Sequence, residues 1–238
     1  MRGLFITGTD TGVGKSVLSA AVIAAMREAG EDVRAFKPVV TGLDEPPEQG
    51  DSGGVPWPPD HELLGGAAGM APNDVSPLRF GPAVSPHLAA ALAGAPIAPN
   101  TLVEAAYRAT EPAQPSAPAP TLVVEGVGGL LVPLADSYAI RDLALALALP
   151  LVIAARPGLG TINHTLLTIE AARSVGLHVC AVVLTPWPAD PSTMELSNRS
   201  SIASMGEVEV EVLSNVPSPM GADLAAAGRS LPWRKWIV

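Results

Sequence analysis

The feature that most constrains the fold lies at the start of the chain. There a short apolar run leads through a loop rich in glycine and threonine into an alanine-rich helical pattern. The apolar run covers Leu4 to Ile6, and the loop reads Thr7-Gly-Thr-Asp-Thr-Gly-Val-Gly-Lys-Ser16. A strand, a glycine loop and a helix in this order bring backbone N–H groups and the positive end of a helix dipole to one anion. The order predicts an α/β fold with a phosphate-binding loop.

The last residues of this loop have the chemistry expected of a nucleotide site. The Lys15 ammonium supplies a point charge for the β and γ phosphates, and the Ser16 hydroxyl can bind Mg²⁺. The general pattern has four residues between its first glycine and the Gly-Lys pair, whereas five residues separate Gly8 from Gly14 here. An ordinary strand-to-helix turn is the alternative. The position of Gly-Lys-Ser between a strand and a helix favours the phosphate loop.

Strand-like and helix-like segments alternate along the rest of the chain. Several strands are continuous apolar runs, which is typical of strands covered by helices on both faces. The alternation predicts a doubly wound, mainly parallel α/β sheet of the P-loop NTPase type, with helices on both faces and a single domain over residues 1–238. The predicted strands are 3–7, 32–37, 122–125, 151–155 and 178–184, and the predicted helices are 14–29, 140–149 and 161–175.

Two segments interrupt this alternation. Residues 42–60 are rich in proline, glycine and acidic residues, and residues 110–120 are rich in proline and alanine. We expect both to be surface loops rather than domain boundaries, because the sheet pattern resumes after each of them. The tail at 232–238 contains two tryptophans. We expect it to dock onto the fold rather than to anchor the chain in a membrane.

Charge and cysteine content exclude several classes of function. Fourteen basic against twenty-three acidic residues give a net charge of −9, which argues against nucleic-acid or anionic-membrane binding but leaves room for a local anion site. The one cysteine, Cys180, lies in an apolar run, so we expect a buried and inert thiol and no disulfide. No signal-peptide pattern is visible, and the apolar stretch 143–155 is too short to span a bilayer. A cytoplasmic location is therefore expected.

Other candidate residues follow predicted strands, whose carboxyl ends lie on one edge of a parallel sheet. Lys37 could hold a phosphate or a developing anion there, although a solvated surface lysine is the alternative. Glu125 closes an apolar strand, where a phosphate-loop protein places a Mg²⁺ ligand, and the alternative is a strand-capping glutamate. Gly126 and Gly128 would let the backbone approach a ligand closely.

The segment 158–164 also follows a strand and opens a helix. The free N–H groups from Thr161 to Asn163 would form an anion site, although Thr161 could simply be the helix N-cap. His164 is interpreted as a structural histidine. Asp51 and Asp60 in the long loop are solvated charges by default, and one of them could complete a Mg²⁺ shell.

Together these segments resemble the dethiobiotin synthetase family. The resemblance runs in family order over about residues 3–200, and the longer first spacing of the glycine loop is itself a family feature. The matching segments are Thr7-Gly-Thr-Asp-Thr-Gly-Val-Gly-Lys-Ser16, Lys37-Pro-Val-Val-Thr-Gly42, Ser85-Pro-His87, Val124-Glu-Gly-Val-Gly-Gly-Leu130 and Leu159-Gly-Thr-Ile-Asn-His164.

The resemblance implies an ATP- and Mg²⁺-dependent carboxylation and ring closure of 7,8-diaminopelargonic acid, with CO₂ or bicarbonate as the carbon source. Lys15 and Lys37 would be the catalytic cations at the γ-phosphate and the carbamate. The phosphates would be held by Thr11, Gly12, Val13, Gly14, Lys15, Ser16 and Val17. The Mg²⁺ ligands would be Ser16, Asp60 and Glu125. The substrate would be bound by Thr41, Glu125, Gly126 and Gly128, and its carboxylate by Gly160, Thr161, Ile162 and Asn163 donated across a homodimer interface.

One segment departs from the family pattern. After the strand predicted to end at Leu184, the family often carries an asparagine that reads adenine, whereas this chain continues Thr185-Pro-Trp-Pro188. Pro186 and Trp187 could enclose a base, with Val216 and Pro217 close to the nucleoside, but they offer few side-chain hydrogen bonds. We therefore expect ATP to be accepted with weak discrimination against other nucleoside triphosphates.

Two other classes of protein share the phosphate loop. Amidating synthetases of corrin synthesis usually carry a fused glutaminase domain with a nucleophilic cysteine, for which this chain has no room. Nucleotide-switched positioning ATPases often have an extra lysine early in the loop, where Thr9 and Asp10 stand here. Metal-delivery ATPases need Cys/His clusters, which the sequence lacks. The synthetase is the interpretation that the motifs favour.

Overall fold

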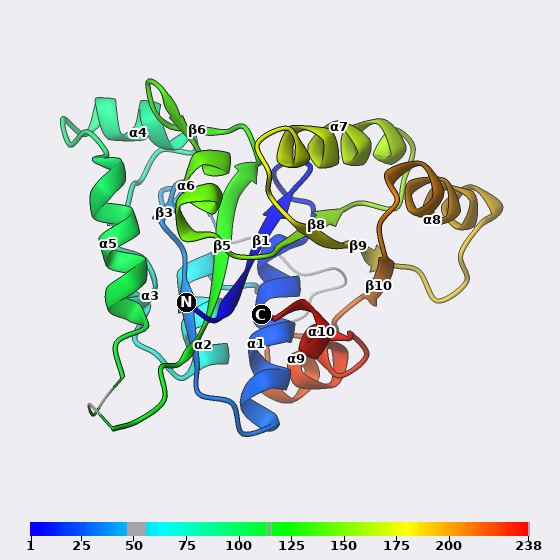
Figure 1. Ribbon diagram of the computed structural model, residues 1–238, viewed down its shortest axis with the longest axis horizontal. Helices are drawn as coiled ribbons and strands as arrows, with labels where there is room; N and C mark the ends of the chain where they lie inside the picture. The colour runs from blue at the N-terminus through cyan, green and yellow to red at the C-terminus, as the bar shows by residue number, and fades with distance from the viewer. Residues whose placement is uncertain (47–55, 113, 115, 238) are drawn as a thin grey trace.

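The computed structural model describes residues 1–46, 56–112, 114 and 116–237, and a six-stranded parallel sheet forms its centre (Figure 1). The strand order is β10-β9-β8-β1-β5-β2, and all neighbouring pairs in this sheet are parallel. The strands are β1 (Gly3–Gly8), β2 (Val33–Phe36), β5 (Thr121–Gly129), β8 (Leu151–Ala155), β9 (Val179–Trp187) and β10 (Val210–Ser214).

The strands are apolar on both sides because alternate side chains enter two separate cores. In β1, Leu4 and Ile6 belong to one buried cluster, whereas Phe5 between them belongs to the other. In β8, Val152 and Ile153 divide in the same way. This alternation explains why the central strands are continuous apolar runs in the sequence.

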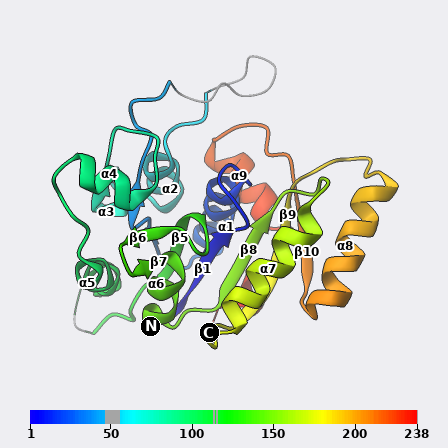
Figure 2. The same cartoon turned by 90° about the horizontal axis from the view of Figure 1, so that it is seen from above.

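Helices cover both faces of the sheet, and the view from above separates the two layers (Figure 2). The first layer contributes to the cluster around Leu4 and Ile6 and consists of α1 (Lys15–Glu28), α2 (Asp60–Ala68), α3 (Pro72–Val75), α9 (Gly221–Gly228) and α10 (Trp233–Trp236). The second layer contributes to the cluster around Phe5 and consists of α4 (Pro86–Leu92), α5 (Pro99–Ala109), α6 (Ile140–Leu147), α7 (Thr161–Arg173) and α8 (Thr193–Gly206).

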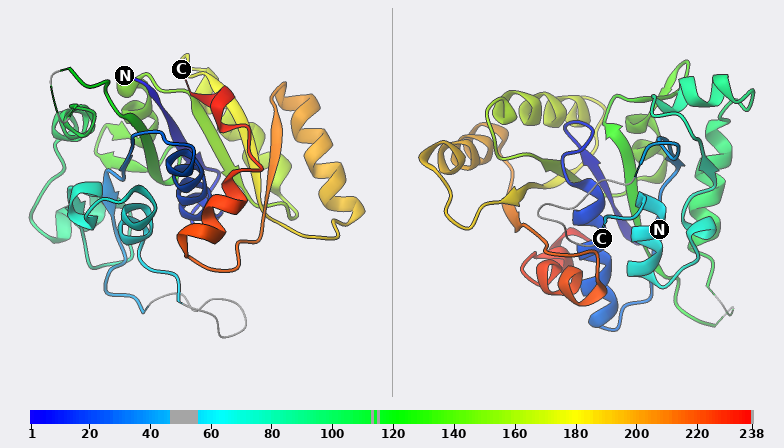
Figure 3. Two further views of the ribbon diagram at one scale, coloured as in Figure 1. Left: turned by 90° about the horizontal axis from the view of Figure 1, so that it is seen from below. Right: turned by 180° about the vertical axis from the view of Figure 1, so that it is seen from behind.

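Two small sheets and the C-terminal segment complete the fold. β3 (Val39–Val40) pairs with β4 (Leu78–Arg79), and β6 (Pro133–Ala135) pairs with β7 (Tyr138–Ala139). The C-terminal segment lies on the α1 side of the sheet, where Trp233 and Trp236 are buried (Figure 3). The predicted docking of the tail is confirmed.

The predicted doubly wound α/β fold is confirmed, and the structure corrects several details. β9 does not end at Leu184 but continues through Trp187, and β5 continues from Glu125 to Gly129. Asp60 does not lie in a loop, because it is the first residue of α2. Residues 47–55, including Asp51 and much of the loop predicted over 42–60, and residues 113 and 115 of the loop over 110–120, lie outside the described residues.

Cys180 is only partly buried, contrary to the expectation of a buried thiol. Its Sγ donates a hydrogen bond to the Leu151 carbonyl oxygen at 3.2 Å, and burial raises the pKa of the thiol to about 12. The thiolate is therefore strongly disfavoured at neutral pH. In the part of the chain that the structure describes, no helix has the length and apolar content needed to span a bilayer.

Candidate functional site

The glycine loop leaves the carboxyl end of β1 and enters α1, as the motif requires. Gly14 occupies the N-cap of α1 with φ +88°, and a Cβ built on it would lie 2.8 Å from Cγ2 of Thr185. Only glycine satisfies both the backbone angle and this close approach. Thr185 therefore packs directly against the turn that starts α1.

Lys15 is buried beneath the loop and only 6% exposed. Its Nζ donates a hydrogen bond to the Asp10 carbonyl oxygen at 2.7 Å, which is a bond within the loop itself. Burial and the positive charge of Lys37 lower the pKa of Lys15 to about 8. An anion placed in the loop would offer this ammonium a stronger partner than a carbonyl.

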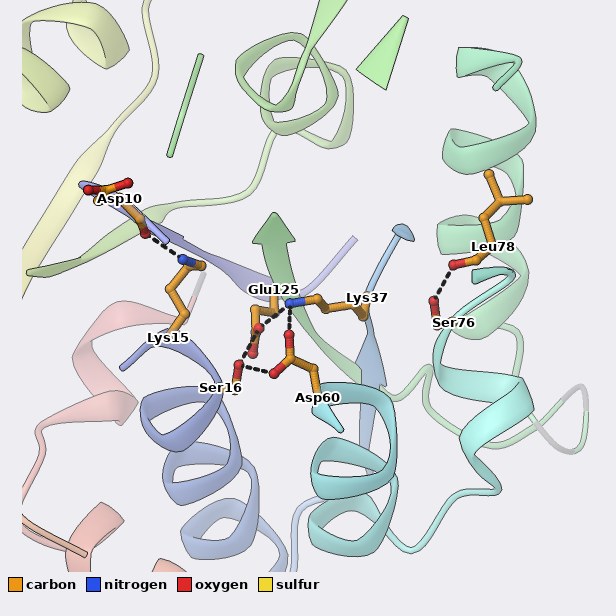
Figure 4. A network of polar contacts seen from close by, with 8 residues as sticks. All are labelled: Asp10, Lys15, Ser16, Lys37, Asp60, Ser76, Leu78 and Glu125. Carbon is orange, nitrogen blue, oxygen red and sulfur yellow. Dashed lines mark hydrogen bonds and ion pairs between the residues drawn. The ribbon is translucent and has the colours of Figure 1, made fainter. Parts of the chain in front are cut away.

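Four polar side chains from four separate segments of the chain meet beside the loop (Figure 4). Ser16 lies in the first turn of α1, Lys37 follows β2, Asp60 begins α2 and Glu125 lies in β5. The Ser16 Oγ is 2.6 Å from Asp60 Oδ1 and 2.8 Å from Glu125 Oε1. The Lys37 Nζ is 2.5 Å from both Asp60 Oδ2 and Glu125 Oε1. These four residues are called the Lys37 cluster below.

Burial strengthens the electrostatic interactions within the Lys37 cluster. Lys37 is 3% exposed, so the alternative of a solvated surface lysine is wrong. Glu125 is fully buried and lies inside β5, which continues to Gly129, so the alternative of a strand-capping glutamate is wrong as well. Burial alone would lower the pKa of Lys37, but the charges of Asp60 and Glu125 outweigh it and raise the pKa. Burial alone would raise the pKa of Asp60, yet Lys37 and Ser16 hold it below its usual value. Lys37 and Asp60 are therefore both charged at neutral pH.

The donor set of this cluster fits a Mg²⁺ ion. The Ser16 hydroxyl has one proton and cannot donate to both carboxylates at once. Glu125 Oε2 is buried and finds no hydrogen-bond partner among the described residues. Oxygen ligands from one or two carboxylates and a hydroxyl, completed by phosphate and water, are what Mg²⁺ prefers. Within the same residues no group of three His, Cys, Asp or Glu side chains could hold a metal.

Gly126 and Gly128, two of the three glycines that follow Glu125, have different surroundings. A Cβ on Gly126 would lie 3.0 Å from Ile140 Cγ2 and 3.2 Å from Phe5 Cε1, so core packing fills that space. A Cβ on Gly128, whose φ is +59°, would lie 3.4 Å from Thr11 Oγ1. Gly128 therefore borders the phosphate loop, whereas the side-chain position of Gly126 faces the core.

The start of α7 forms a second polar feature. Gly160 is its N-cap with φ +90°, and Thr161 is the first helical residue, so the alternative interpretation of Thr161 as the N-cap is wrong. Asn163 and His164 are exposed in this first turn. In the described part of the chain no hydrogen bond or ion pair joins this turn to the Lys37 cluster.

A depression of about 480 Å³ lies between the phosphate loop and α7. Its walls include Thr9, Asp10, Leu131, His164 and Leu167. Leu131 and Leu167 are more than half exposed. The depression combines a polar end at the loop with an apolar side formed by these leucines.

The residues predicted to enclose the base differ in exposure. Pro186 and Pro217 are exposed, Val216 is buried, and Trp187 is only 8% exposed and belongs to the apolar cluster around Phe5. The Trp187 indole therefore packs in the core and does not offer an open face for stacking on a base. Of the neighbouring residues Pro186 and Trp187, only Pro186 is exposed.

Sequence reasoning missed Arg156, which directly follows β8. Its Nε and Nη2 donate to the Gly12 carbonyl oxygen at 3.1 and 2.8 Å. The rule that singled out Lys37, a charged residue after an apolar strand, would also have found Arg156.

A parallel sheet whose first strand leads through Gly-Lys-Ser into a helix, with an acidic residue on a neighbouring strand beside the serine, defines a phosphate-loop nucleotide-binding protein. A family model described as an AAA domain matches residues 2–221. The comparison with known proteins then identifies the family.

The chain is 41% identical to a protein of Anaeromyxobacter dehalogenans (strain 2CP-1) over 235 residues, 97% of this chain and 96% of the relative. It is 37% identical to one of Mycobacterium sp. (strain JLS), with 94% and 92% covered. It is 32% identical to one of Bacillus velezensis, with 88% and 84% covered. All three are named ATP-dependent dethiobiotin synthetase. The chain therefore belongs to the dethiobiotin synthetase family.

Proposed function

We propose that this protein is an ATP- and Mg²⁺-dependent dethiobiotin synthetase. It would carboxylate 7,8-diaminopelargonic acid with CO₂ and close the cyclic urea, releasing ADP and phosphate. The observation that carries the proposal is the Lys37 cluster beside the phosphate loop, in a chain whose relatives bear this name. None of the comparisons favours a nucleotide-switched or metal-delivery ATPase.

The proposed reaction has three steps. One amine of the substrate adds to CO₂ and loses a proton, which gives a carbamate. A carbamate oxygen attacks the γ-phosphorus and the bond to ADP breaks, which gives a carbamic–phosphoric anhydride. The second amine attacks the carbonyl carbon, the urea ring closes, and phosphate leaves as that amine loses its proton. Negative charge moves between oxygens throughout, so fixed cations and N–H donors lower the barriers.

The phosphate loop would bind the nucleotide through Thr11 and the backbone amides of residues 12–17. Lys15 would exchange the Asp10 carbonyl for the β and γ phosphates, which keeps its ammonium charged. Lys37, already held between two carboxylates, would contact the γ-phosphate and the carbamate. Ser16, Asp60 and Glu125 would hold Mg²⁺, which supplies positive charge at the phosphates.

The diamine would lie between the Lys37 cluster and the start of α7 of a second copy. Thr41, Glu125, Gly126 and Gly128 would contact its amines or carbamate. Its carboxylate would accept hydrogen bonds from the backbone amides of residues 160–163 across a homodimer interface. The apolar side of the depression suits the substrate's hydrocarbon chain, and Leu159, which is 94% exposed, supports burial of this face in a dimer.

The nucleoside would lie near Pro186, Trp187, Val216 and Pro217, where the buried Trp187 would support the pocket from beneath. Because these side chains carry few hydrogen-bonding groups, we predict that CTP and GTP replace ATP with kcat/KM values within about tenfold. Steady-state kinetics with the three nucleotides checks this. A preference for ATP above about a hundredfold would contradict it.

The proposed function is tested by phosphate release from Mg·ATP and bicarbonate, with and without 7,8-diaminopelargonic acid, and by mass detection of the product. We expect release that depends on the diamine and a product with the mass of the cyclic urea. Release that ignores the diamine would contradict the proposal. The net charge of −9 supports an enzyme without a nucleic-acid or anionic-membrane partner, and a cytoplasmic location is part of the proposal.

A further inference from the structure

Arg156 touches the phosphate loop from the strand next to it. β8 pairs with β1, and the Thr9 N–H at the base of the loop donates to the Ala154 carbonyl oxygen at 3.0 Å. Two residues further on, the Arg156 guanidinium reaches the loop and donates from Nε and Nη2 to the single carbonyl oxygen of Gly12. Sheet order therefore brings the two residues together, although 144 positions separate them in sequence.

The direction of this carbonyl determines the direction of an amide that a phosphate needs. A trans peptide unit is planar, and its C=O and N–H point to opposite sides. If Arg156 holds the Gly12 carbonyl on one side, the Val13 N–H must point to the other. Among the described residues no hydrogen bond of normal geometry is donated by the amides of Gly12, Val13 or Gly14, so an anion can accept from them.

Two carbonyl oxygens of the loop accept hydrogen bonds from cationic side chains. Only one of the two cations would have a further role in binding the phosphates. Lys15 holds the Asp10 carbonyl, and under the proposed function it leaves that carbonyl for the phosphates. Arg156 holds the Gly12 carbonyl by two bonds from a rigid planar fork, which a lysine cannot reproduce. Arg156 is therefore suited to hold the loop while Lys15 moves.

We propose that Arg156 is a positioning residue that holds the phosphate loop in the shape that receives a nucleoside di- or triphosphate. It acts through the Gly12–Val13 peptide rather than on the reacting atoms. The inference rests on the nucleotide binding of the proposed function. It adds the residue that directly follows β8 to a site otherwise built from α1, β5 and the segments around Lys37 and Asp60.

The test is calorimetric binding of Mg·ATP, Mg·ADP and AMP to the wild type and to R156Q and R156K. We expect R156Q to weaken ATP and ADP about tenfold, because a charge-assisted pair of hydrogen bonds that orders the loop is lost. AMP, which lacks the β and γ phosphates, should change by less than about twofold. R156K should recover little of the lost affinity, because a lysine restores the charge but cannot donate two hydrogen bonds from a planar group to the Gly12 carbonyl oxygen.

R229Q is the matched control, because Arg229 is an exposed arginine whose Nη1 pairs with Glu28 Oε2 at 2.6 Å, at the far end of α1. It should leave all three affinities unchanged. Steady-state kinetics should show a higher KM for ATP in R156Q, kcat within about threefold, and an unchanged melting temperature, which separates positioning from a structural role.

The outcomes distinguish this inference from the proposed function. If the wild type binds no ATP, the proposed function and this inference are both overturned. If the wild type and R156Q bind ATP equally, the inference alone is overturned. If R156K binds ATP as tightly as the wild type, charge rather than the grip on Gly12 is responsible, and the inference is overturned as well.

Discussion

At the scale of single residues, the site depends on a buried cation held between two carboxylates. Lys37, Asp60 and Glu125 make contacts of 2.5 Å in an environment where Lys37 and Glu125 are almost fully removed from water. Such a network contributes little net stability when intact, because desolvation offsets the attraction. Removing one member leaves an uncompensated charge, which is costly. The network therefore fixes the positions of charged groups beside the phosphate loop rather than stabilising the fold.

The first prediction concerns Lys37→Met. We expect kcat to fall at least about a hundredfold, because a fixed positive charge at the transferring phosphoryl group is lost. The free energy of unfolding should fall by about 3 kcal/mol, because two carboxylates remain without their cation. Phosphate release and urea unfolding measure the two effects. Lys235→Met, at an exposed lysine in α10, is the control, and a kcat within about threefold of wild type for Lys37→Met would contradict the assignment.

The second prediction concerns pH and Asp60. Its folded pKa lies below the ordinary value of 3.8, because Lys37 and Ser16 outweigh the effect of burial. The unfolded chain therefore binds more protons around pH 4, and the stabilisation from Asp60 is present above that pH and lost as the pH falls through the folded pKa. Urea unfolding from pH 6 to pH 3 should show the difference between wild type and Asp60→Asn shrinking at the acid end. A difference that stays constant over this range would contradict the pairing.

At the scale of elements, the starts of α1 and α7 are built in the same way. Each helix follows a parallel strand, and each has a glycine with positive φ as its N-cap, Gly14 and Gly160. This arrangement turns the free amides of the first helical turn toward the carboxyl edge of the sheet. The first start would receive phosphates and the second a carboxylate, so one structural solution would serve both ends of the substrate complex.

The third prediction concerns Gly160→Ala. Nothing lies within 4 Å of a Cβ at this position, so the φ of +90° is the source of strain. We expect a loss of about 1 kcal/mol in unfolding free energy. The KM for the diamine should rise while the KM for ATP is unchanged, because only the carboxylate site is distorted. Gly158→Ala, where a Cβ also meets nothing and φ is not in the left-handed region, is the matched control. Equal effects of the two variants would contradict a special role for Gly160.

At the scale of the whole molecule, large apolar side chains are exposed beside the phosphate loop and the start of α7. Leu159, Leu167 and Leu131 are 94%, 56% and 57% exposed, and two of them line the depression beside the phosphate loop. Exposed apolar groups that gather next to a site are typical of a surface that another chain covers. The proposed homodimer would bury them and bring the start of α7 of one copy to the Lys37 cluster of the other.

The fourth prediction concerns this face. Leu167→Glu should convert the dimer to monomers and abolish diamine-dependent turnover, while Mg·ATP still binds, because the nucleotide site lies within one copy. Sedimentation velocity and calorimetry measure the two effects. Leu196→Glu on α8, where the leucine is 51% exposed, is the control. A monomeric wild type, or a fully active monomeric variant, would contradict the proposed interface.

Sequence patterns predicted the strands and helices that alternate most regularly and missed those with weak local signals. The strand over 151–155 was predicted with its observed bounds, whereas β10, the two small sheets and seven helices, α2 to α5 and α8 to α10, were not predicted. The two-residue and four-residue elements are too short for a periodic pattern. The longer helices α5 and α8 were missed although they span 11 and 14 residues. Trp187 was expected near a base, but β9 continues through it and packs its ring in the core.

The phosphate loop, the parallel sheet and the residue types at the carboxyl edge could be predicted from the chain alone, because glycine conformation, apolar runs and strand ends are local properties. Which of those residues meet depends on how the elements pack. Asp60 was one of two candidate acids in a long segment, and it reaches Ser16 and Lys37 because α2 packs against α1 and β2. Arg156 reaches Gly12 because β8 lies beside β1. Such contacts depend on the order of strands and the packing of helices, which no segment of the chain encodes alone.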